Sequence, residues 1–436
     1  MHDFKGRDII SIEDFDREDL MYVMKTAELM ETNDYSDLLK GMIIATLFFE
    51  PSTRTRFSFE TAALKLGAQV ITTSSAQFSS LYKGETLFDT AAVIGGYADV
   101  LVMRHPEKGS AHALAAGTDK PVINGGDGPG EHPSQTLLDL YTIMTEKGTL
   151  DSLHIGFVGD LKNGRTVHSL VTALKFFNPT LYFIAPKALA IPEEYKKMLD
   201  DAAITYHVTE SLDEYLDKID VLYVTRIQKE RFSDPAEYEK LKHVYVIDRN
   251  TLSQAKPDIS IMHPLPRVGE IKEEIDDTKN AVYFRQAWNG VPVRMALLAL
   301  VTGKFVLKDE RTLHRLVKKN VLVSIGTDED KKTLLPEIQH MHQLGYNIYA
   351  TDKTSKFLAA SGVPNTRLHK ISDKASKPNI KDFLAEKRLD MIINIPTGKG
   401  GAEDTDGALM RKMAIGQQIP LFTELQVVRF LMQALD

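Results

Sequence analysis

The chain has 436 residues, of which 43% are hydrophobic and 26% are charged, so it can bury the cores of two or three domains. Its formal net charge of -7 argues against general nucleic-acid binding, and positive charge for an anionic substrate must therefore be local. The lack of cysteine excludes disulfides, thiolate zinc sites and a cysteine nucleophile, and because no run approaches a membrane span or a secretory segment, we expect a cytoplasmic protein without membrane partners.

The first expected elements are a helix and a strand. Residues 10–30 have the spacing of an amphipathic helix, with Asp14 or Ser11 as its cap. Residues 42–49 are apolar and partly β-branched, which indicates a buried strand, and a second helical pattern follows it. The stretch Ser52-Thr53-Arg54-Thr55 therefore falls at a strand-to-helix turn.

This turn has the composition of an anion site. A helix begins with unpaired backbone N–H groups and the positive end of its dipole, to which hydroxyls and a guanidinium add donors. Arg54 and Arg56 are two residues apart and cannot share a helix face, so we assign Arg54 to the anion and Arg56 to a structural ion pair. The alternative is that Ser52 or Thr53 only caps the helix and the arginines are solvated.

Three later segments of this half carry polar residues at turns. After a short strand at 70–73, the loop 79–86 combines serines, Lys83 and a glycine before a helix at 87–97; it is a second anion contact or, alternatively, a solvated loop. Strands at 99–103 and 122–124 lead to polar residues, namely Arg104, His132 and Gln135. Ligands of parallel α/β sheets bind beyond the carboxyl ends of the strands, so we expect these side chains to converge.

A second α/β unit begins near His154. We expect strands at 154–160, 181–185, 221–225 and 244–247 and a helix from 163 to 177. The G-x-G-x-x-G spacing of a dinucleotide site is absent. Arg165 and Arg226 follow two of these strands and suit a dicarboxylate, unless each pairs with nearby acidic residues.

The segment 261–267 and the end of the chain complete the pattern. In Ile261-Met262-His263-Pro264-Leu265-Pro266-Arg267, prolines remove N–H donors and leave carbonyls that can accept from an NH2 group; a helix at 292–301 follows.

Beyond a charged connector, strands at 321–325, 346–350 and 391–395 alternate with helices and predict a small parallel α/β domain. Its turns 351–356 and 397–401 contain anion-friendly residues without the Walker spacing.

Several motifs together resemble one enzyme family. F-F-E-P-S-T-R-T-R-F-S-F-E, K-G-E-T, M-R-H-P, H-P-S-Q-T-L-L-D-L, T-R-I-Q-K-E-R and H-P-L-P-R, in this order, are similar to the aspartate carbamoyltransferases over roughly residues 1–303. The related ornithine enzymes usually carry cysteine where this chain has Pro264.

The resemblance implies roles for individual residues. Ser52, Thr53, Arg54 and Thr55 would hold the phosphate of carbamoyl phosphate, and Arg104, His132 and Thr55 would polarise the carbamoyl carbonyl. Gln135 and the carbonyls of Pro264 and Leu265 would fix the carbamoyl nitrogen. The L-aspartate carboxylates would bind to Arg165, Arg226 and Gln228.

The resemblance also implies an assembly. Lys83, with Ser79 or Ser80, would reach in from a neighbouring subunit, so the active form would be at least a homotrimer. Glu50 would pair with Arg165 and Arg231 when two domains close. The oxyanion needs donors aimed at it, and the departing phosphate can take the amine proton, so no cofactor, metal or protein nucleophile is required.

The C-terminal part resembles methylglyoxal-synthase-like domains, as found at the allosteric end of carbamoyl phosphate synthetases. A-T-D-K-T-S, H-K-I, I-I-N-I-P and I-P-L-F-T carry this resemblance. It implies that Thr351, Thr354, Lys370 and Asn394 surround the phosphate of a phosphorylated or nucleotide effector. Because the catalytic aspartate motif of the synthases is not evident, we expect regulation rather than lyase chemistry. A domain that only assembles subunits is the alternative.

We therefore expect an α/β protein with two parallel-sheet αβα subdomains and a small C-terminal Rossmann-like domain. The expected parts are a carbamoyl phosphate domain at 1–140 completed by a helix at 288–303, an aspartate domain at 141–287, a connector at 304–320 and a regulatory domain at 321–436. The alternative functions are carbamoyl transfer to another amine, and a scaffold whose functional part is the C-terminal domain; the latter would require substitutions in the anion pocket, and none is seen.

Overall fold

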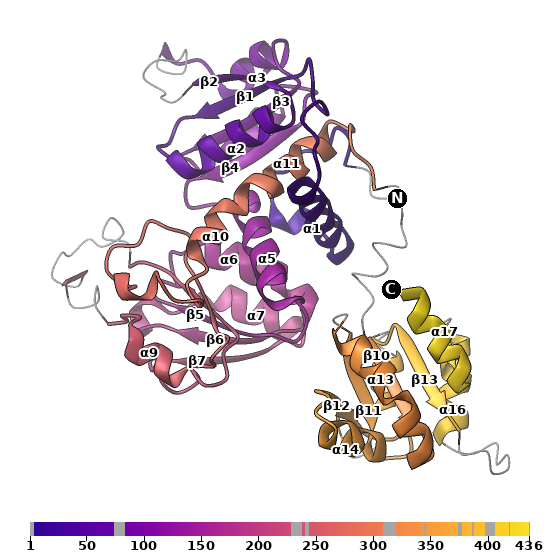
Figure 1. Ribbon diagram of the computed structural model, residues 1–436. Helices are drawn as coiled ribbons and strands as arrows, with labels where there is room; N and C mark the ends of the chain where they lie inside the picture. Colours follow the sequence, from indigo (N-terminus) through magenta and orange to yellow (C-terminus); the bar gives the residue numbers. More distant parts are fainter. Residues whose placement is uncertain are drawn as a thin grey trace. The chain divides into compact units, whose positions relative to one another are not determined.

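The computed structural model describes residues 4–73, 83–227, 238–239, 244–307, 320–343, 346–373, 377–385, 388–396, 406–417 and 419–435. The chain forms two compact units, Met1–Lys308 and Asp309–Asp436, which are described in turn (Figure 1).

The first unit begins with a parallel sheet in the order β2-β1-β3-β4 (Figure 1). The chain leaves the central strand in one direction to β2 and then passes to the other side, so a topological switch point lies between β1 and β3. The elements of this lobe are β1 (Ile43–Phe48), α2 (Thr53–Lys65), β2 (Gln69–Thr73), α3 (Leu87–Gly95), β3 (Val100–His105), α4 (Ser110–Ala115), β4 (Val122–Asp127) and α5 (Pro133–Lys147).

A second parallel sheet, in the order β7-β6-β5-β8-β9, has its own switch point between β5 and β8. Its strands are buried at the centre, as the residues of β8 show. The elements are β5 (His154–Val158), α6 (Arg165–Leu174), η4 (Lys175–Phe177), β6 (Thr180–Ile184), η5 (Lys187–Leu189), α7 (Glu193–Asp201), β7 (Thr205–Thr209), β8 (Val221–Val224), α9 (Arg249–Gln254), β9 (Ser260–Met262), η7 (Glu273–Ile275) and α10 (Tyr283–Trp288).

Two helices from opposite ends of the unit pack together on the first lobe. After η1 (Ile12–Asp14), α1 (Arg17–Thr32) contacts α11 (Gly290–Val301), and α11 also contacts α2 and α5. All residues of α11 except Val291 are buried, which agrees with its almost uninterrupted apolar sequence. The chain therefore returns to the lobe from which it started.

The second unit is the predicted small parallel α/β domain, with strand order β12-β11-β10-β13-β14. Apolar residues are buried on both faces of the sheet. The elements are β10 (Asn320–Ile325), α13 (Asp328–Gln343), β11 (Asn347–Thr351), α14 (Asp352–Ala360), β12 (Thr366–Leu368), α15 (Ile380–Ala385), β13 (Met391–Ile395), α16 (Asp406–Gly416), β14 (Leu421–Phe422) and α17 (Leu425–Leu435). The predicted α/β class with parallel sheets is thus confirmed.

Some predicted elements differ from the structure. The first helix begins at Arg17 rather than at residue 10, because Asp16 caps it and Ser11 closes a separate capping box on η1. The predicted strand at 244–247 is wrong: Ile247 makes one isolated bridge, and Asp248 then caps α9. The edge strands β7, β12 and β14 and the short β9 were not predicted; β7 and β12 are partly exposed, so they lack a continuous apolar run.

Candidate active site

A cavity of about 580 Å³ lies in the first unit, beyond the carboxyl ends of strands from both sheets. It brings together residues from the turn after β1, the end of β3, the start of α5, the starts of the segments after β5 and β8, and the loop after β9. Of the residues predicted for the site, the cavity is lined by Glu50, Ser52, Thr53, Arg54, Thr55, Arg104, His132, Gln135, Arg165, Arg226, Pro264 and Leu265.

Only one of the remaining predicted residues of the transferase site, Lys83, is described by the structure. Lys83 is exposed and is absent from the cavity wall formed by the described residues. Ser79, Ser80, Gln228 and Arg231 lie outside the described residues.

The N-terminus of α2 presents its hydroxyls to the cavity. Ser52 occupies the N-cap position, but within this described helix its side chain makes no capping hydrogen bond. The capping role considered as an alternative for Ser52 is therefore wrong. Arg56 lies 2.8 Å from Glu60 in an ion pair, as predicted, whereas Arg54 lines the cavity and has no carboxylate partner among the described residues.

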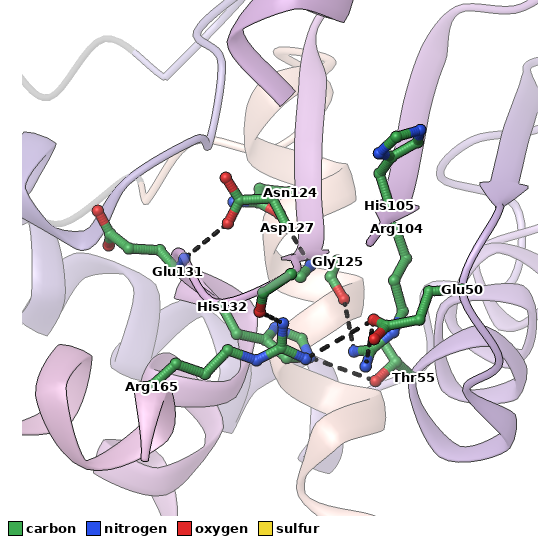
Figure 2. A network of polar contacts seen from close by, with 12 residues as sticks. Glu50, Thr55, Arg104, His105, Asn124, Gly125, Asp127, Glu131, His132 and Arg165 are labelled. Atoms are coloured by element: carbon green, nitrogen blue, oxygen red, sulfur yellow. Dashed lines mark hydrogen bonds and ion pairs between the residues drawn. The ribbon is translucent and has the colours of Figure 1, made fainter. Parts of the chain in front are cut away.

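A carboxylate links arginines from the two lobes (Figure 2). Glu50 lies 2.8 Å from the guanidinium of Arg104 and 3.9 Å from that of Arg165. Arg104 also donates to the carbonyl of Gly125 at 3.2 Å, and Arg165 donates to the carbonyl of Gly128. The contact of Glu50 with Arg165 was predicted, but its closer contact with Arg104 was not.

Gly126 allows these groups to approach one another. Its φ of +115° is unfavourable for residues with a side chain. A Cβ atom there would lie 2.8 Å from Nη1 of Arg104 and 3.3 Å from both Nη2 of Arg165 and Cδ2 of His132. The absence of a side chain at this position therefore sets the spacing of three site residues.

His132 is a buried, neutral imidazole. Its Nε2 lies 3.3 Å from Oγ1 of Thr55 (Figure 2), and its Nδ1 lies 3.4 Å from Oγ of Ser134. Burial lowers the pKa of His132 well below its usual value, and the guanidinium groups of Arg104 and Arg165 lower this pKa further. The ring can therefore share hydrogen bonds at the cavity without adding charge near neutral pH.

Hydrogen bonds of His263 fix the loop after β9. Leu265 has a φ of +56° in the left-handed region, and its N–H donates to Nδ1 of His263 at 2.8 Å. Nδ1 is therefore the acceptor, so Nε2 of His263 carries the proton that it donates to Glu270 at 2.7 Å. These bonds hold Pro264 and Leu265 at the cavity wall.

The cavity is strongly cationic. Among the described residues that line it are five arginines, at 54, 104, 165, 226 and 294, and one carboxylate, Glu50. Burial lowers the pKa of Arg104 to about 10 and that of Arg294 to about 9, so both groups keep their charge at neutral pH. Such a site suits a substrate pair with phosphate and carboxylate groups. No cluster of metal-ligating side chains occurs among the described residues.

The sequence reasoning missed several wall residues, among them Thr166, Gln286 and Arg294. Arg294 had a usable signal, since it is the one charged residue in the apolar stretch of α11. Gln286 lies in the short helix α10 and has no comparable signal in the sequence.

In the second unit, three of the four predicted effector residues converge at the ends of β10, β11 and β13. Oγ1 of Thr351 lies 3.2 Å from Oγ of Ser324 and 3.4 Å from Oγ1 of buried Thr354. Asn394 Nδ2 lies 3.5 Å from the carbonyl of Ser324, and its Oδ1 accepts from Arg411 at 2.6 Å. Lys370 is exposed on the segment after β12.

The first unit thus belongs to a class of two-lobed α/β enzymes whose cationic cleft lies at two switch points. Residues 7–145 match the aspartate/ornithine carbamoyltransferase carbamoyl-P binding domain, residues 151–301 match the Asp/Orn binding domain of the same family, and residues 333–423 match the MGS-like domain. The chain belongs to the aspartate/ornithine carbamoyltransferase family.

Similar proteins carry that name. The aspartate carbamoyltransferase catalytic subunit of Thermococcus kodakarensis is 52% identical over 305 residues, which are 69% of this chain and 98% of that protein. The catalytic subunit of M. jannaschii aspartate transcarbamoylase superimposes with a TM-score of 0.64 at 51% identity, over 67% of this chain and 96% of that one. The Trypanosoma cruzi aspartate transcarbamoylase in complex with N-(phosphonacetyl)-L-aspartic acid superimposes with a TM-score of 0.64 at 40% identity, over 68% of this chain and 96% of that one.

Within the described residues, no helix is both long and apolar enough to cross a membrane.

Proposed function

We propose that the chain transfers the carbamoyl group of carbamoyl phosphate to the amine of L-aspartate, which gives N-carbamoyl-L-aspartate and phosphate for pyrimidine biosynthesis. The observation that carries this proposal is the single cavity in which Ser52–Thr55, Arg104 and His132 face Arg165 and Arg226. One group of donors suits a phosphate, and the other suits the two carboxylates of aspartate.

The chemistry follows from this arrangement. The α2 N-terminus and Arg54 hold the phosphate, and Arg104, Thr55 and neutral His132 donate to the carbamoyl oxygen as it gains negative charge. The aspartate amine forms the new C–N bond, the C–O bond to phosphate breaks, and the departing phosphate accepts the amine proton. Orientation of two bound anions and exclusion of water supply the acceleration.

The acceptor is tested by direct competition. Purified protein is incubated with carbamoyl phosphate and either L-aspartate or L-ornithine, and the carbamoylated product is identified by mass spectrometry. We expect turnover with aspartate only. Turnover with ornithine, or with neither amine, would contradict the proposal.

We further propose a homotrimer in which Lys83, with Ser79 or Ser80, completes the neighbouring subunit's site. Two observations support it: Lys83 is exposed and absent from its own described cavity wall, and large apolar side chains of α2, β2, α3 and the turn after α3 are exposed. These side chains are Phe57, Leu64, Ile71, Phe88, Val93 and Tyr97. Exposed apolar side chains are removed from water when a second subunit covers them.

Mixed assemblies test the shared site. Arg54→Ala and Lys83→Ala chains are each expected to be inactive, but subunits exchanged between the two preparations should regain activity, because one site then has both residues intact. Light scattering gives the subunit number. Failure of exchanged subunits to regain activity would place Lys83 outside the shared site.

Regulation by the second unit is also part of the proposal. The polar cluster of Thr351, Thr354 and Asn394 supports a phosphorylated or nucleotide effector, with Lys370 as an exposed cation beside the same sheet. Calorimetry of the full chain against nucleotides and phosphorylated metabolites should find a ligand that changes activity and binds more weakly to Lys370→Ala. If no ligand of the panel binds, the unit is an assembly module instead.

The proposed location is the cytoplasm, supported by the cysteine-free composition.

A further inference from the structure

A buried carboxylate lies beneath the cavity, at a position that the proposed chemistry does not use. Asp139 of α5 is fully buried and accepts hydrogen bonds from three side chains of different elements. Oδ1 accepts from Nε2 of Gln135 at 2.9 Å and from Nε2 of Gln286 at 2.7 Å. Oδ2 accepts from the hydroxyl of Tyr223 at 2.8 Å.

The first bond determines which end of the Gln135 amide faces the cavity. Gln135 and Asp139 are four residues apart on α5 and therefore lie on one face of the helix. Because the amide nitrogen donates to Asp139, the amide oxygen is left for the cavity, where it can accept from an NH2 group. Without an acceptor at residue 139, the amide can rotate and present its own NH2 group.

The second bond, from Gln286, connects Asp139 to the loop after β9. Nε2 of Gln286 donates to Asp139, so Oε1 of Gln286 is available to accept the backbone N–H of His263 at 2.8 Å. His263 then accepts the N–H of Leu265. Asp139 is therefore connected through two residues to the carbonyls of Pro264 and Leu265.

A buried cation accompanies the carboxylate. Arg294 is 2% exposed, stacks 4.9 Å from the ring centroid of Phe59, and attracts Asp139 electrostatically. A Cβ on Gly290 would lie 2.2 Å from its Nη1, so the glycine makes room for this side chain. Burial raises the pKa of Asp139 to about 7, while the bonds from Gln286, Tyr223 and Gln135 oppose this rise.

We propose that Asp139 is a positioning residue that turns three acceptors, Oε1 of Gln135 and the carbonyls of Pro264 and Leu265, toward the nitrogen of the bound acyl phosphate. The site would thereby select carbamoyl phosphate over acyl phosphates with a methyl group in place of NH2. This inference rests on the proposed function. A site built of acceptors rejects a methyl group because buried acceptors are left without donors.

The test compares carbamoyl phosphate with acetyl phosphate, which has a methyl group where the former has NH2. The KM of carbamoyl phosphate and the inhibition constants of acetyl phosphate and inorganic phosphate are measured for the wild type, Asp139→Leu and Asp139→Asn. The selectivity ratio is the inhibition constant of acetyl phosphate divided by the KM of carbamoyl phosphate. We expect Asp139→Leu to reduce this ratio by about tenfold or more, while the inhibition constant of inorganic phosphate stays within about twofold of the wild-type value.

The asparagine variant separates positioning from stability. Both variants remove the counter-charge of Arg294, so a purely structural role predicts equal changes in the two proteins. An asparagine oxygen still accepts from Gln135 and Gln286, so the selectivity ratio should stay close to that of the wild type. Equal loss in both variants, or no loss in Asp139→Leu, would overturn the proposal.

Two further variants complete the design. If Asp139→Leu does not fold, Gln286→Met, which removes the bonds of residue 286 to Asp139 and His263 but keeps the bond between Gln135 and Asp139, should lower the ratio by a smaller factor, and an unchanged ratio would overturn the inference. Asp151→Asn is a matched control, because Asp151 pairs with Arg17 at 2.7 Å and does not line the cavity. If wild-type protein does not turn over carbamoyl phosphate, the proposed function fails, and this outcome is distinct from unchanged selectivity in an active variant.

Discussion

Replacement of Gly126 by alanine should disrupt the site by a single methyl group. The new Cβ would lie 2.8 Å from Nη1 of Arg104, and a φ of +115° is one that L-residues rarely adopt. We expect a loss of roughly 1–3 kcal/mol in the free energy of unfolding from the strained backbone. We also expect kcat/KM to fall by about 100-fold, since a displacement of about 1 Å in a catalytic group can have an effect of this size.

The assay combines steady-state kinetics for both substrates with urea unfolding. Gly148→Ala is the matched control, because Gly148 also has a positive φ of +70° but no described atom lies within 4 Å of the added Cβ. The control should lose stability by about 1 kcal/mol and keep its kcat/KM. If Gly126→Ala kept wild-type kinetics, the close approach of Arg104, Arg165 and His132 would not be what sets the activity.

Three other outcomes follow from the site. Arg54→Ala should raise the KM of carbamoyl phosphate by about 100-fold, because the phosphate loses charged hydrogen bonds that contribute roughly 3 kcal/mol. Arg56→Ala should leave this KM within about twofold and lower the free energy of unfolding by at most about 1 kcal/mol. Equal effects of the two substitutions on KM would refute the assignment. Glu50→Gln should lower kcat by about tenfold, measured at saturating substrate, because the lobes lose the carboxylate between Arg104 and Arg165; an unchanged kcat would contradict this. The pKa of His132 is lowered in the folded state, so below pH 6.5 the unfolded state binds the extra proton and stability falls with acidification. Urea unfolding between pH 5 and 7 should show a weaker pH dependence for His132→Asn, and an equal slope would refute the burial argument.

The sequence allowed prediction of groups that neighbouring residues place directly. Ser52–Thr55 could be located because an apolar strand and a helix enclose them, and the turn itself creates the anion site. Helical geometry allowed only one of Arg54 and Arg56 to reach the pocket, and the choice of Arg56 for an ion pair is confirmed by its contact with Glu60. The central strands were predictable because strands buried on both faces consist of continuous apolar runs.

Contacts between distant segments were not predictable in the same way. Gln286 reaches Asp139 across 147 positions of sequence, and only the packing of α10 against α5 brings them together. The close contact of Glu50 with Arg104 likewise depends on how β1 and β3 pair. Asp139 itself gave a signal, since it is a carboxylate in an apolar helical stretch, where an ionisable group needs partners.

The return of α11 to its starting lobe has a mechanical consequence. Since α1 and α11 pack together, the segment with Arg165 and Arg226 is an insertion into the first lobe, and Arg17 of α1 ties it back to the start of the chain through Asp151 at 2.7 Å. Leu307 follows α11, and its N–H donates to the hydroxyl of Tyr22 on α1 at 2.9 Å. The end of this unit is therefore anchored on α1, a helix that also holds the second lobe, because Arg17 donates to the carbonyl of Phe176 at 2.6 Å.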